Sequence, residues 1–296
     1  MFRYSESNLN NMQWLTPNQS LFYFGGKPAV EFFNNQITKR RDEIPVTQTD
    51  THLEKVTELK SRGFTKWTQM LDHSVLDSIN DKVSYYISKN TNLKSIDEHY
   101  AMIADPLINV PEILEIAFSD HILDFSEQYF ECYPALGTFN LRRTFLNNLP
   151  PKSTQFFHCD RNSIKFFKFF IYLNDVQSVE DGPLTIVEGS NLKRPVNCFN
   201  QHRWQDNEIH NIYGKENFRY LTASKGDLIA GTTTCFHKGN KPTSKERTML
   251  TLNYVVHPEL AGGRPGEYEK FFKIKQEQYD SLTFRKKRAA DFLEKI

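Results

Sequence analysis

The chain has 296 residues, of which 39% are hydrophobic and 25% charged, and it is long enough to bury a substantial core. Its formal net charge of +1 leaves no strongly basic footprint of the kind that nucleic acid binding requires. The four cysteines are scattered without a CxxC pair, which argues against a disulfide framework and a thiolate zinc site. Neither a signal peptide nor a membrane-spanning apolar run is evident, so we expect a cytoplasmic protein with no membrane partner.

The first half of the chain is predicted to be mainly helical. Residues 1–50 are polar, rich in Asn and Gln and weakly periodic, so we expect them to be irregular. From Thr51 onward apolar residues recur at helical spacing, and Gly63 is placed to end that helix in the left-handed conformation. A second helix is predicted from about Ser74 and a third after Pro111.

Beyond Pro134 the pattern changes to short runs rich in Phe, Thr, Ile and Val with turn residues between them. Together with 24 Phe and 13 Tyr, these runs predict an α+β chain with a jelly-roll core covered by helices. A polar stretch at 197–219 interrupts the series, and the last thirty residues return to a helical pattern. The expected strands are Thr138–Leu146, Gln155–His158, Ile164–Leu173, Leu184–Val187, Asp227–Thr234 and Thr248–Val256.

The tripeptide His-x-Asp/Glu, which could supply two metal ligands, occurs three times in the sequence. By itself it is a weak signal of a metal site. His52 starts one match on a predicted helix, where residues two apart face away from each other. His257 starts another at a strand end, with no histidine after it. His158 and Asp160 follow an apolar run at a predicted strand end, where residues two apart point to the same side. His237 follows the strand Asp227–Thr234 and supplies a second imidazole.

Two imidazoles and one carboxylate on one face of an iron leave three positions open, which is the facial triad of non-haem iron(II) oxygenases. The open positions suit a bidentate co-substrate together with dioxygen. Arg247 follows His237 by ten residues, and we expect a hairpin through residues 238–245 to bring it close to the metal. A guanidinium there would bind the distal carboxylate of 2-oxoglutarate in a bidentate, charge-assisted pair.

In these residues the chain resembles the phytanoyl-CoA dioxygenase family of 2-oxoglutarate oxygenases. The resemblance implies a double-stranded β-helix, iron(II), 2-oxoglutarate and dioxygen, and oxidation of a small-molecule C–H bond. Asn191 and Glu188 depart from the family's pattern at positions that are not metal ligands. The matching segments, in chain order, are 59–72, Gln155 to Asp160, Tyr172 to Asp175, Glu180 to Leu184, Gly189-Ser190, Gly226 to Leu228, His237 to Gly239 and Arg247.

The resemblance also bears on the type of reaction. Halogenating members of this superfamily lack the carboxylate ligand, so Asp160 favours hydroxylation or a related oxidation. Relatives that repair alkylated bases carry a second Arg six residues after the first, where this chain has Asn253. Nucleic acid is therefore not an expected partner, and a small-molecule metabolite is.

Further residues are candidates for contact with the co-substrate or substrate. The resemblance suggests such a contact for Gln155, whereas strand alternation argues against it, so both readings stay open. One of Arg142 and Arg143 must face inward on a regular strand, and an inward Arg needs an anionic partner. Thr248, next to Arg247, either helps to position 2-oxoglutarate or only favours the strand.

Trp204 and Tyr213, in the 197–219 insertion, form a lid over the substrate or decorate a surface loop. We expect a single domain, 1–296, with a mainly helical part at 1–133, the β-helix core at 134–257 and a helical segment at 258–296. The predicted function is a hydroxylase that releases succinate and carbon dioxide. The alternatives are a non-catalytic small-molecule or sugar-binding protein of the same fold, and a metal-dependent isomerase or dioxygenase without 2-oxoglutarate, for which Arg247 stays unexplained.

Overall fold

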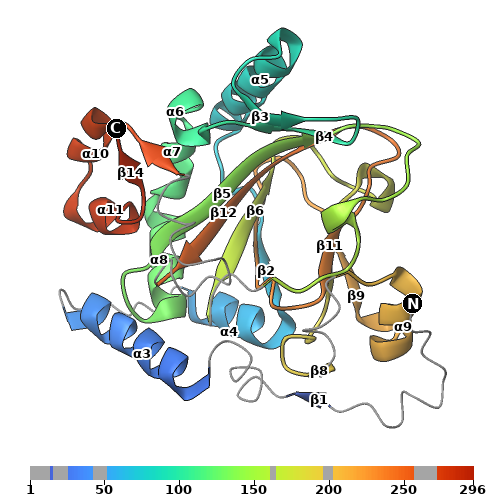
Figure 1. Cartoon of the computed structure of the whole chain (residues 1–296), viewed down its shortest axis with the longest axis horizontal. Helices are drawn as coiled ribbons and strands as arrows, with labels where there is room; N and C mark the ends of the chain where they lie inside the picture. The colour runs from blue at the N-terminus through green and yellow to red at the C-terminus, as the bar shows by residue number, and fades with distance from the viewer. Residues whose placement is uncertain (1–13, 16–25, 43–51, 161–164, 196–202, 257–271) are drawn as a thin grey trace.

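The computed structural model describes residues 14–15, 26–42, 52–160, 165–195, 203–256 and 272–296. Its centre is two antiparallel sheets, one of seven strands in the order β2-β10-β6-β12-β5-β4-β3 and one of three in the order β11-β7-β9 (Figure 1). From β6 to β12 the chain passes repeatedly between the two sheets. This double-stranded β-helix confirms the predicted fold class, an α+β chain with a jelly-roll core.

The two sheets are built from strands that come from different parts of the chain. The large sheet contains β2 (Phe64–Trp67), β3 (Leu93–Ile96), β4 (Tyr100–Ile103), β5 (Ala135–Thr144), β6 (Phe167–Tyr172), β10 (Leu228–Gly231) and β12 (Arg247–Val255), and the small sheet contains β7 (Leu184–Val187), β9 (Phe218–Leu221) and β11 (His237–Gly239). Two further strand pairs join β1 (Trp14–Leu15) to β8 (Arg194–Pro195) and β13 (Lys273–Ile274) to β14 (Glu294–Lys295).

Side-chain alternation gives the large sheet two different faces. On β6, Phe167, Phe169 and Ile171 join the main hydrophobic core with helical residues such as Leu59 and Phe125. The intervening residues of β6 face the small sheet. The helices are α3 (Gly26–Asp42), α4 (Leu53–Arg62), α5 (His73–Lys89), α6 (Pro106–Asn109), α7 (Ile113–Ala117), α8 (Asp120–Phe130), α9 (Asp206–Tyr213), α10 (Gln276–Asp280) and α11 (Phe284–Ala289).

The N-terminal helices follow the predicted pattern with two differences. The predicted helix that ends at Gly63 is confirmed as α4, and Gly63 has φ 90° and caps it with an N–H to the Leu59 carbonyl. A Cβ at Gly63 would lie 2.3 Å from the Cys235 sulfur, so only glycine fits. The helix predicted after Pro111 breaks at Phe118 into α7 and α8. The prediction that residues 1–50 are irregular is wrong over α3; most of the others lie outside the described residues.

The strand predictions fail where local pattern is weakest. β5, β6, β7, β10 and β12 overlap their predicted runs, whereas β2, β3, β4, β9 and β11 are too short or too polar to stand out in the sequence. The run predicted as a strand at Gln155–His158 is instead a 3-10 turn, η3 (Ser153–Gln155), followed by single bridges at Phe157 and His158. In the described part of the C-terminal segment, the predicted helical character is present in α10 and α11, which the short strands β13 and β14 flank. Among the described residues no helix is long and apolar enough to cross a membrane.

Candidate metal centre and adjoining cavities

The two histidines of the predicted triad lie on backbone segments that are hydrogen-bonded to each other. The N–H of His158 donates to the His237 carbonyl and the N–H of His237 donates to the His158 carbonyl, both over 3.0 Å. The Asp160 N–H donates to the Thr233 carbonyl over 2.8 Å. The segment 158–160 is thus held against the segment 233–237, which brings residues nearly eighty positions apart to one place.

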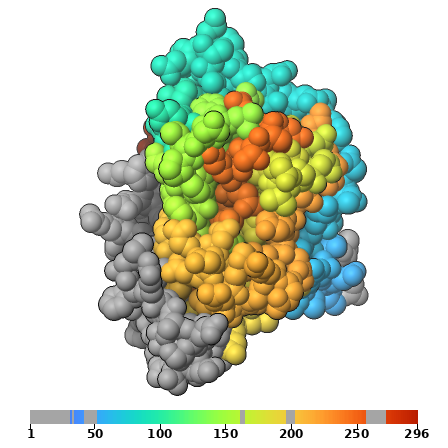
Figure 2. Space-filling view, turned by 90° about the vertical axis from the view of Figure 1, so that its right-hand side faces the viewer, coloured from blue at the N-terminus to red at the C-terminus, as the bar shows by residue number. Residues whose placement is uncertain are grey.

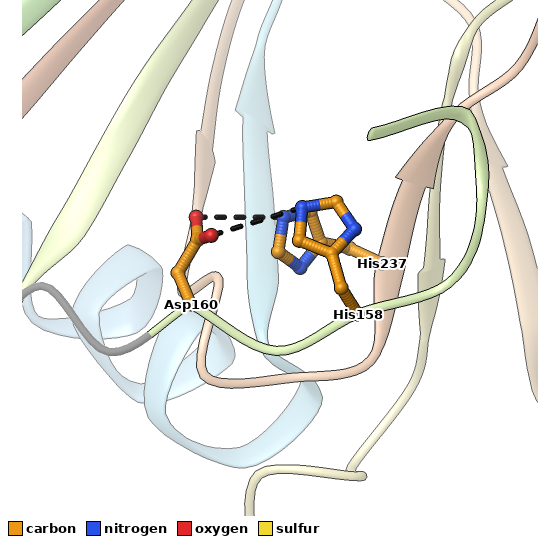
Figure 3. Close-up of side chains that lie close together, drawn as sticks. All are labelled: His158, Asp160 and His237. Carbon is orange, nitrogen blue, oxygen red and sulfur yellow. Dashed lines mark ion pairs between the residues drawn. The ribbon is translucent and has the colours of Figure 1, made fainter. Parts of the chain in front are cut away.

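The side chains of the triad converge, as Figure 3 shows. Nε2 of His158 lies 3.7 Å from Oδ1 of Asp160, and Nε2 of His237 lies 3.5 Å from Oδ2. One ligand atom from each residue lies within 4.8 Å of the others, and no other such group of His, Cys, Asp and Glu occurs in the part of the chain that the structure describes. Sequence reasoning predicted this set, and the structure brings all three residues together.

Hydrogen bonds on the far side of each ring set the tautomer of both histidines. Nδ1 of His158 lies 2.9 Å from the Phe156 carbonyl, and Nδ1 of His237 lies 3.0 Å from the Cys235 carbonyl. Because a carbonyl only accepts, each Nδ1 carries the hydrogen and each Nε2 presents a lone pair towards Asp160. Burial, helped by the neighbouring His237, lowers the pKa of His158 to about 3, so its ring is a neutral ligand at physiological pH.

The carboxylate of the triad is kept ionised by its neighbours. Burial by itself would raise the pKa of Asp160, but the Lys168 ammonium holds that pKa well below its usual range. Nζ of Lys168 lies 2.5 Å from Oδ2 of Asp160. Two imidazole nitrogens and an ionised carboxylate, all aimed at one point, form a donor set that a divalent transition metal fits.

Two adjoining cavities open beside the triad. The cavity at His158, Asp160 and His237 has a volume of about 240 Å³ and lies between the sheets, with Phe170 of β6 and Leu184 of β7 in its walls. The neighbouring cavity has about 180 Å³ and includes Arg247 and Gln155. Four residues line both cavities, so the second continues the first: Met102, Arg142, Thr154 and Gly239.

Arg247 is a buried cation without an acidic partner among the described residues. Its side chain is within hydrogen-bond reach of the Gly182 carbonyl, of the Asn240 carbonyl at 3.4 Å and of the Thr144 hydroxyl at 3.3 Å. Its Nε is buried and has no partner in the described structure. Burial lowers the pKa of Arg247 to about 10, so the guanidinium stays charged at neutral pH. A charge buried in this way calls for an anion.

The chain reaches Arg247 by a different route from the one predicted. β11 belongs to the small sheet and β12 to the large one, so residues 240–246 cross between sheets instead of forming a hairpin. This connection is held by a hydrogen bond from the Lys241 ammonium to the Leu149 carbonyl and by one from the Thr243 N–H to the Glu180 carbonyl. Figure 2 shows it in orange-red, between the green segment before His158 and the yellow-green segment before β7.

The two neighbouring arginines of β5 point to opposite faces. Arg142 lines both cavities, with its guanidinium 5.3 Å from the centre of the Tyr100 ring. The guanidinium of Arg143 lies against α5, where it donates to Asn80 Oδ1 over 2.8 Å and to Ser84 Oγ over 3.0 Å. Strand alternation therefore makes Arg142 the inward arginine, and the geometry speaks against a substrate contact for Arg143.

Gln155 and Thr248 also differ in whether they face the cavities. Because Gln155 lies in the 3-10 turn, strand alternation does not apply to it, and it lines the cavity that contains Arg247. Its Oε1 accepts a hydrogen bond from the Lys152 N–H over 2.8 Å. The Thr248 hydroxyl accepts from Nε of Arg143 over 2.9 Å, on the face away from both cavities. Thr251, three residues on, lines the metal cavity instead.

The aromatic residues Trp204 and Tyr213 of the 197–219 insertion pack behind β11, the strand that begins with His237. Trp204 is buried, its backbone pairs with Phe157 in both directions, and its ring packs on Phe236. The Tyr213 hydroxyl donates to the Lys193 carbonyl over 2.8 Å. Neither residue lines the two cavities, so their described contacts are those of a hydrophobic cluster behind β11 and not of a lid. Residues 196–202 of the insertion lie outside the described residues.

Sequence reasoning missed Lys168 and Thr233, both of which line the metal cavity. A signal for Lys168 was present, because it stands in the middle of an aromatic strand, where a lysine must face something polar or charged. Thr233 carries no such signal, because its position depends on the turn between β10 and β11.

Comparisons with known structures identify the fold. Similar structures include HygX from Streptomyces hygroscopicus with nickel, 2-oxoglutarate and hygromycin B bound (TM-score 0.52, 14% identity, 68% of this chain and 86% of that chain). The epimerase SnoN in complex with Fe3+, alpha ketoglutarate and nogalamycin RO is similar at TM-score 0.54 and 14% identity over 69% of this chain and 82% of that one. EctD from S. alaskensis with 2-oxoglutarate and 5-hydroxyectoine follows at 0.53 and 12%, over 70% and 77%. No family model matches the chain, and no curated protein matches its sequence.

Proposed function

We propose that the protein is an iron(II)- and 2-oxoglutarate-dependent oxygenase that hydroxylates a small-molecule metabolite, with release of succinate and carbon dioxide. One observation carries the proposal: a His-Asp-His triad and the buried guanidinium of Arg247 line adjoining cavities. Among the described residues, this guanidinium has no acidic partner. A metal site without a co-substrate would not need Arg247 there. The solved structures that share the fold are described as complexes with 2-oxoglutarate and a metal, which supports the same reading.

His158, Asp160 and His237 would hold the iron through two Nε2 atoms and one carboxylate oxygen. When bound, iron(II) with 2-oxoglutarate and dioxygen supplies the oxidising power for a C–H bond. The chain's own contribution begins with the carbonyls of Phe156 and Cys235, which fix both rings so that the ligand nitrogens are oriented before the metal arrives.

Arg247 would anchor the distal carboxylate of 2-oxoglutarate. Its Nε has no partner and its fork is held by carbonyls, so the guanidinium is pre-oriented for a bidentate pair. Arg142 and Gln155 line the same cavity and would contact the co-substrate from either side. Gly239 adjoins this cation, because a Cβ built there would be in ordinary van der Waals contact with Nη2 of Arg247, at 3.5 Å.

The carboxylate ligand supports hydroxylation over halogenation within this chemistry, because Asp160 occupies the position that a halide would need. The two apolar walls at Phe170 and Met249 would keep water from the reacting C–H bond. The resemblance to the phytanoyl-CoA dioxygenase family remains part of this proposal and is carried by the motifs alone.

The test is anaerobic reconstitution with iron(II) and 2-oxoglutarate, followed by oxygen. We expect a visible charge-transfer band on addition of 2-oxoglutarate and release of succinate on addition of oxygen. Asp160→Ala should abolish both, whereas Glu54→Ala, in the His-x-Glu match on α4, should change neither. The absence of both band and succinate in the wild-type protein would overturn the proposal in favour of a non-catalytic binding protein.

A further inference from the structure

A second cation, the half-buried Lys168, faces the metal cavity from the end opposite Arg247. Lys168 on β6 pairs in register with Asn253 of β12, six residues beyond Arg247. At about 3.3 Å per residue, that places the two ends of the site about 20 Å apart along β12. The triad lies between them, because Asp160 contacts Lys168 while Gly239, two residues after His237, adjoins Arg247.

The one ion pair that Lys168 makes among the described residues is with the candidate metal ligand Asp160. Its side chain is only 15% exposed, so solvent does little to compensate the charge. A divalent cation at the triad would take up the negative charge of the Asp160 carboxylate, because the metal becomes the largest local charge. Lys168 would then be left as a half-buried ammonium that faces the cavity without an anion of its own.

The charges around the two cavities point the same way. Among the described lining residues, Asp160 is the one acid, against the buried or half-buried cations Arg142, Lys168 and Arg247. Lys152 also lines the second cavity but pairs with Asp97 at the surface. A divalent metal and the 2-oxoglutarate dianion cancel each other, and Asp160 offsets one cation. Two positive charges therefore remain in the loaded site, where an isolated charge is costly.

Neutral polar groups near Lys168 are also without partners. The hydroxyl of Thr233, which lines the metal cavity, is buried and has no hydrogen-bond partner in the described structure. Both amide atoms of Asn253, beside Lys168 in register, are likewise buried and unpaired. Buried polar groups in proteins are normally hydrogen-bonded, so each such group calls for an explanation. Near this end of the site, a bound molecule with polar atoms would supply partners.

We propose that Lys168 anchors the substrate and that the substrate is a small carboxylate, held on the side of the metal opposite the distal carboxylate of 2-oxoglutarate. The inference rests on the proposed function and adds the substrate class to it. The carboxylate pairs with the Lys168 ammonium, Thr233 lies nearby to donate a hydroxyl, and the carbon skeleton lies against Phe170 and Met249. The cavity of about 240 Å³ also receives part of 2-oxoglutarate, so the substrate portion beside the metal is small.

The test measures binding and not turnover, on the full chain loaded with nickel(II) and saturating 2-oxoglutarate. The probes are carboxylates matched with their primary amides, such as pentanoate with pentanamide and 3-phenylpropanoate with 3-phenylpropanamide, titrated by calorimetry. In the wild-type protein at least one carboxylate should bind tenfold or more tightly than its amide. Lys168→Met should bring that ratio close to one without weakening the amide, and Lys168→Arg should retain a preference for the carboxylate.

A matched control removes a lysine elsewhere. Lys66→Met, on β2 at the edge of the large sheet, lowers the net charge equally and should leave the carboxylate preference unchanged. The inference is overturned if no carboxylate binds better than its amide in the wild-type protein, or if the preference survives in Lys168→Met. Nickel and 2-oxoglutarate binding are measured first in every variant. If the wild-type protein binds neither, the proposed function falls as well; if it binds both, a missing preference removes the substrate class alone.

Discussion

Among the described residues, two pairs of histidines have neighbouring rings, and their surroundings give them opposite characters. The rings of His158 and His237 have centroids 4.2 Å apart, and those of His52 and His121 have centroids 4.7 Å apart. In the first pair both Nδ1 atoms are bonded to carbonyls, and both Nε2 atoms face a carboxylate and a cavity. In the second pair Nδ1 of His52 and Nε2 of His121 are buried without a described partner.

The second pair is enclosed by aromatic rings. Trp67 and Phe125 pack edge-on against it, with ring centroids 5.3 Å from His121 and 5.9 Å from His52. Neither histidine lines either of the two cavities beside the triad. His52 also begins one of the three His-x-Asp/Glu matches in the sequence. The difference teaches that the ligand character of a histidine pair comes from its hydrogen bonds and from a facing carboxylate, and not from burial or proximity.

Removing a metal ligand should give the largest difference between the two histidine pairs. His237→Ala should lower metal affinity by more than the roughly 10- to 100-fold that loss of an outer hydrogen-bond partner costs, because a direct ligand is lost. His121→Ala should leave metal affinity unchanged. Titration with cobalt(II), followed by its visible absorption, measures both. Equal loss in the two variants would mean that the effect comes from unfolding and not from the site.

The co-substrate anchor should give the next largest effect. Arg247→Met should weaken 2-oxoglutarate binding by about 30-fold or more, on the scale of about 2–5 kcal/mol for truncating a buried charge pair. Metal affinity should stay as in the wild-type protein, because Arg247 does not contact the triad. Calorimetric titration of the nickel(II)-loaded variant checks this. Wild-type affinity for 2-oxoglutarate in Arg247→Met would contradict the proposed role.

The histidine pair enclosed by aromatic rings, His52 and His121, should affect how stability depends on pH. Burial lowers the pKa of both His52 and His121 below 6.5, with Asp124 opposing and, for His121, the charge of His52 adding to the effect. As the pH falls, these two histidines therefore take up protons in the unfolded chain before they do so in the folded one. Their contribution to the free energy of unfolding is fully present above pH 6.5, and stability falls as the pH drops below 6.5. Urea unfolding between pH 7.5 and 5 should show a shallower loss in the His52→Leu/His121→Leu variant than in the wild-type protein. Parallel curves would contradict the assignment.

The smallest effect separates the two faces of β12. Thr248→Val should cost about 1 kcal/mol of stability, because it removes the acceptor of one Arg143 hydrogen bond, and should leave 2-oxoglutarate affinity within twofold. Thr251→Val, on the cavity face, is the matched comparison. Thermal unfolding and calorimetry on the two variants give both quantities. A large loss of co-substrate affinity in Thr248→Val would show that its hydroxyl reaches the cavity after all.

Strong local patterns let the sequence predict part of the fold and the candidate metal ligands. The amphipathic stripe before Gly63 predicts α4, because apolar spacing and a left-handed cap are properties of neighbouring residues. β5, β6 and β12 are recognisable for the same reason, because each lies in a run rich in the aromatic, aliphatic and Thr residues that favour strands. The His158, Asp160 and His237 set is predictable because its chemistry demands particular residue types, and Arg247 because an anionic co-substrate demands a cation.

Only the tertiary structure decides which way these residues face and what lies next to them. Alternation on β5 turns Arg142 inward and Arg143 towards α5, but only the pairing with β12 establishes which face is inside. Gln155 escapes strand alternation because a 3-10 turn replaces the expected strand. Lys168 meets Asp160 through contacts between segments and not through a spacing that the sequence displays. Residue types and local periodicity are written along the chain, whereas orientation and neighbourhood follow from long-range packing, and those decide where charge remains uncompensated.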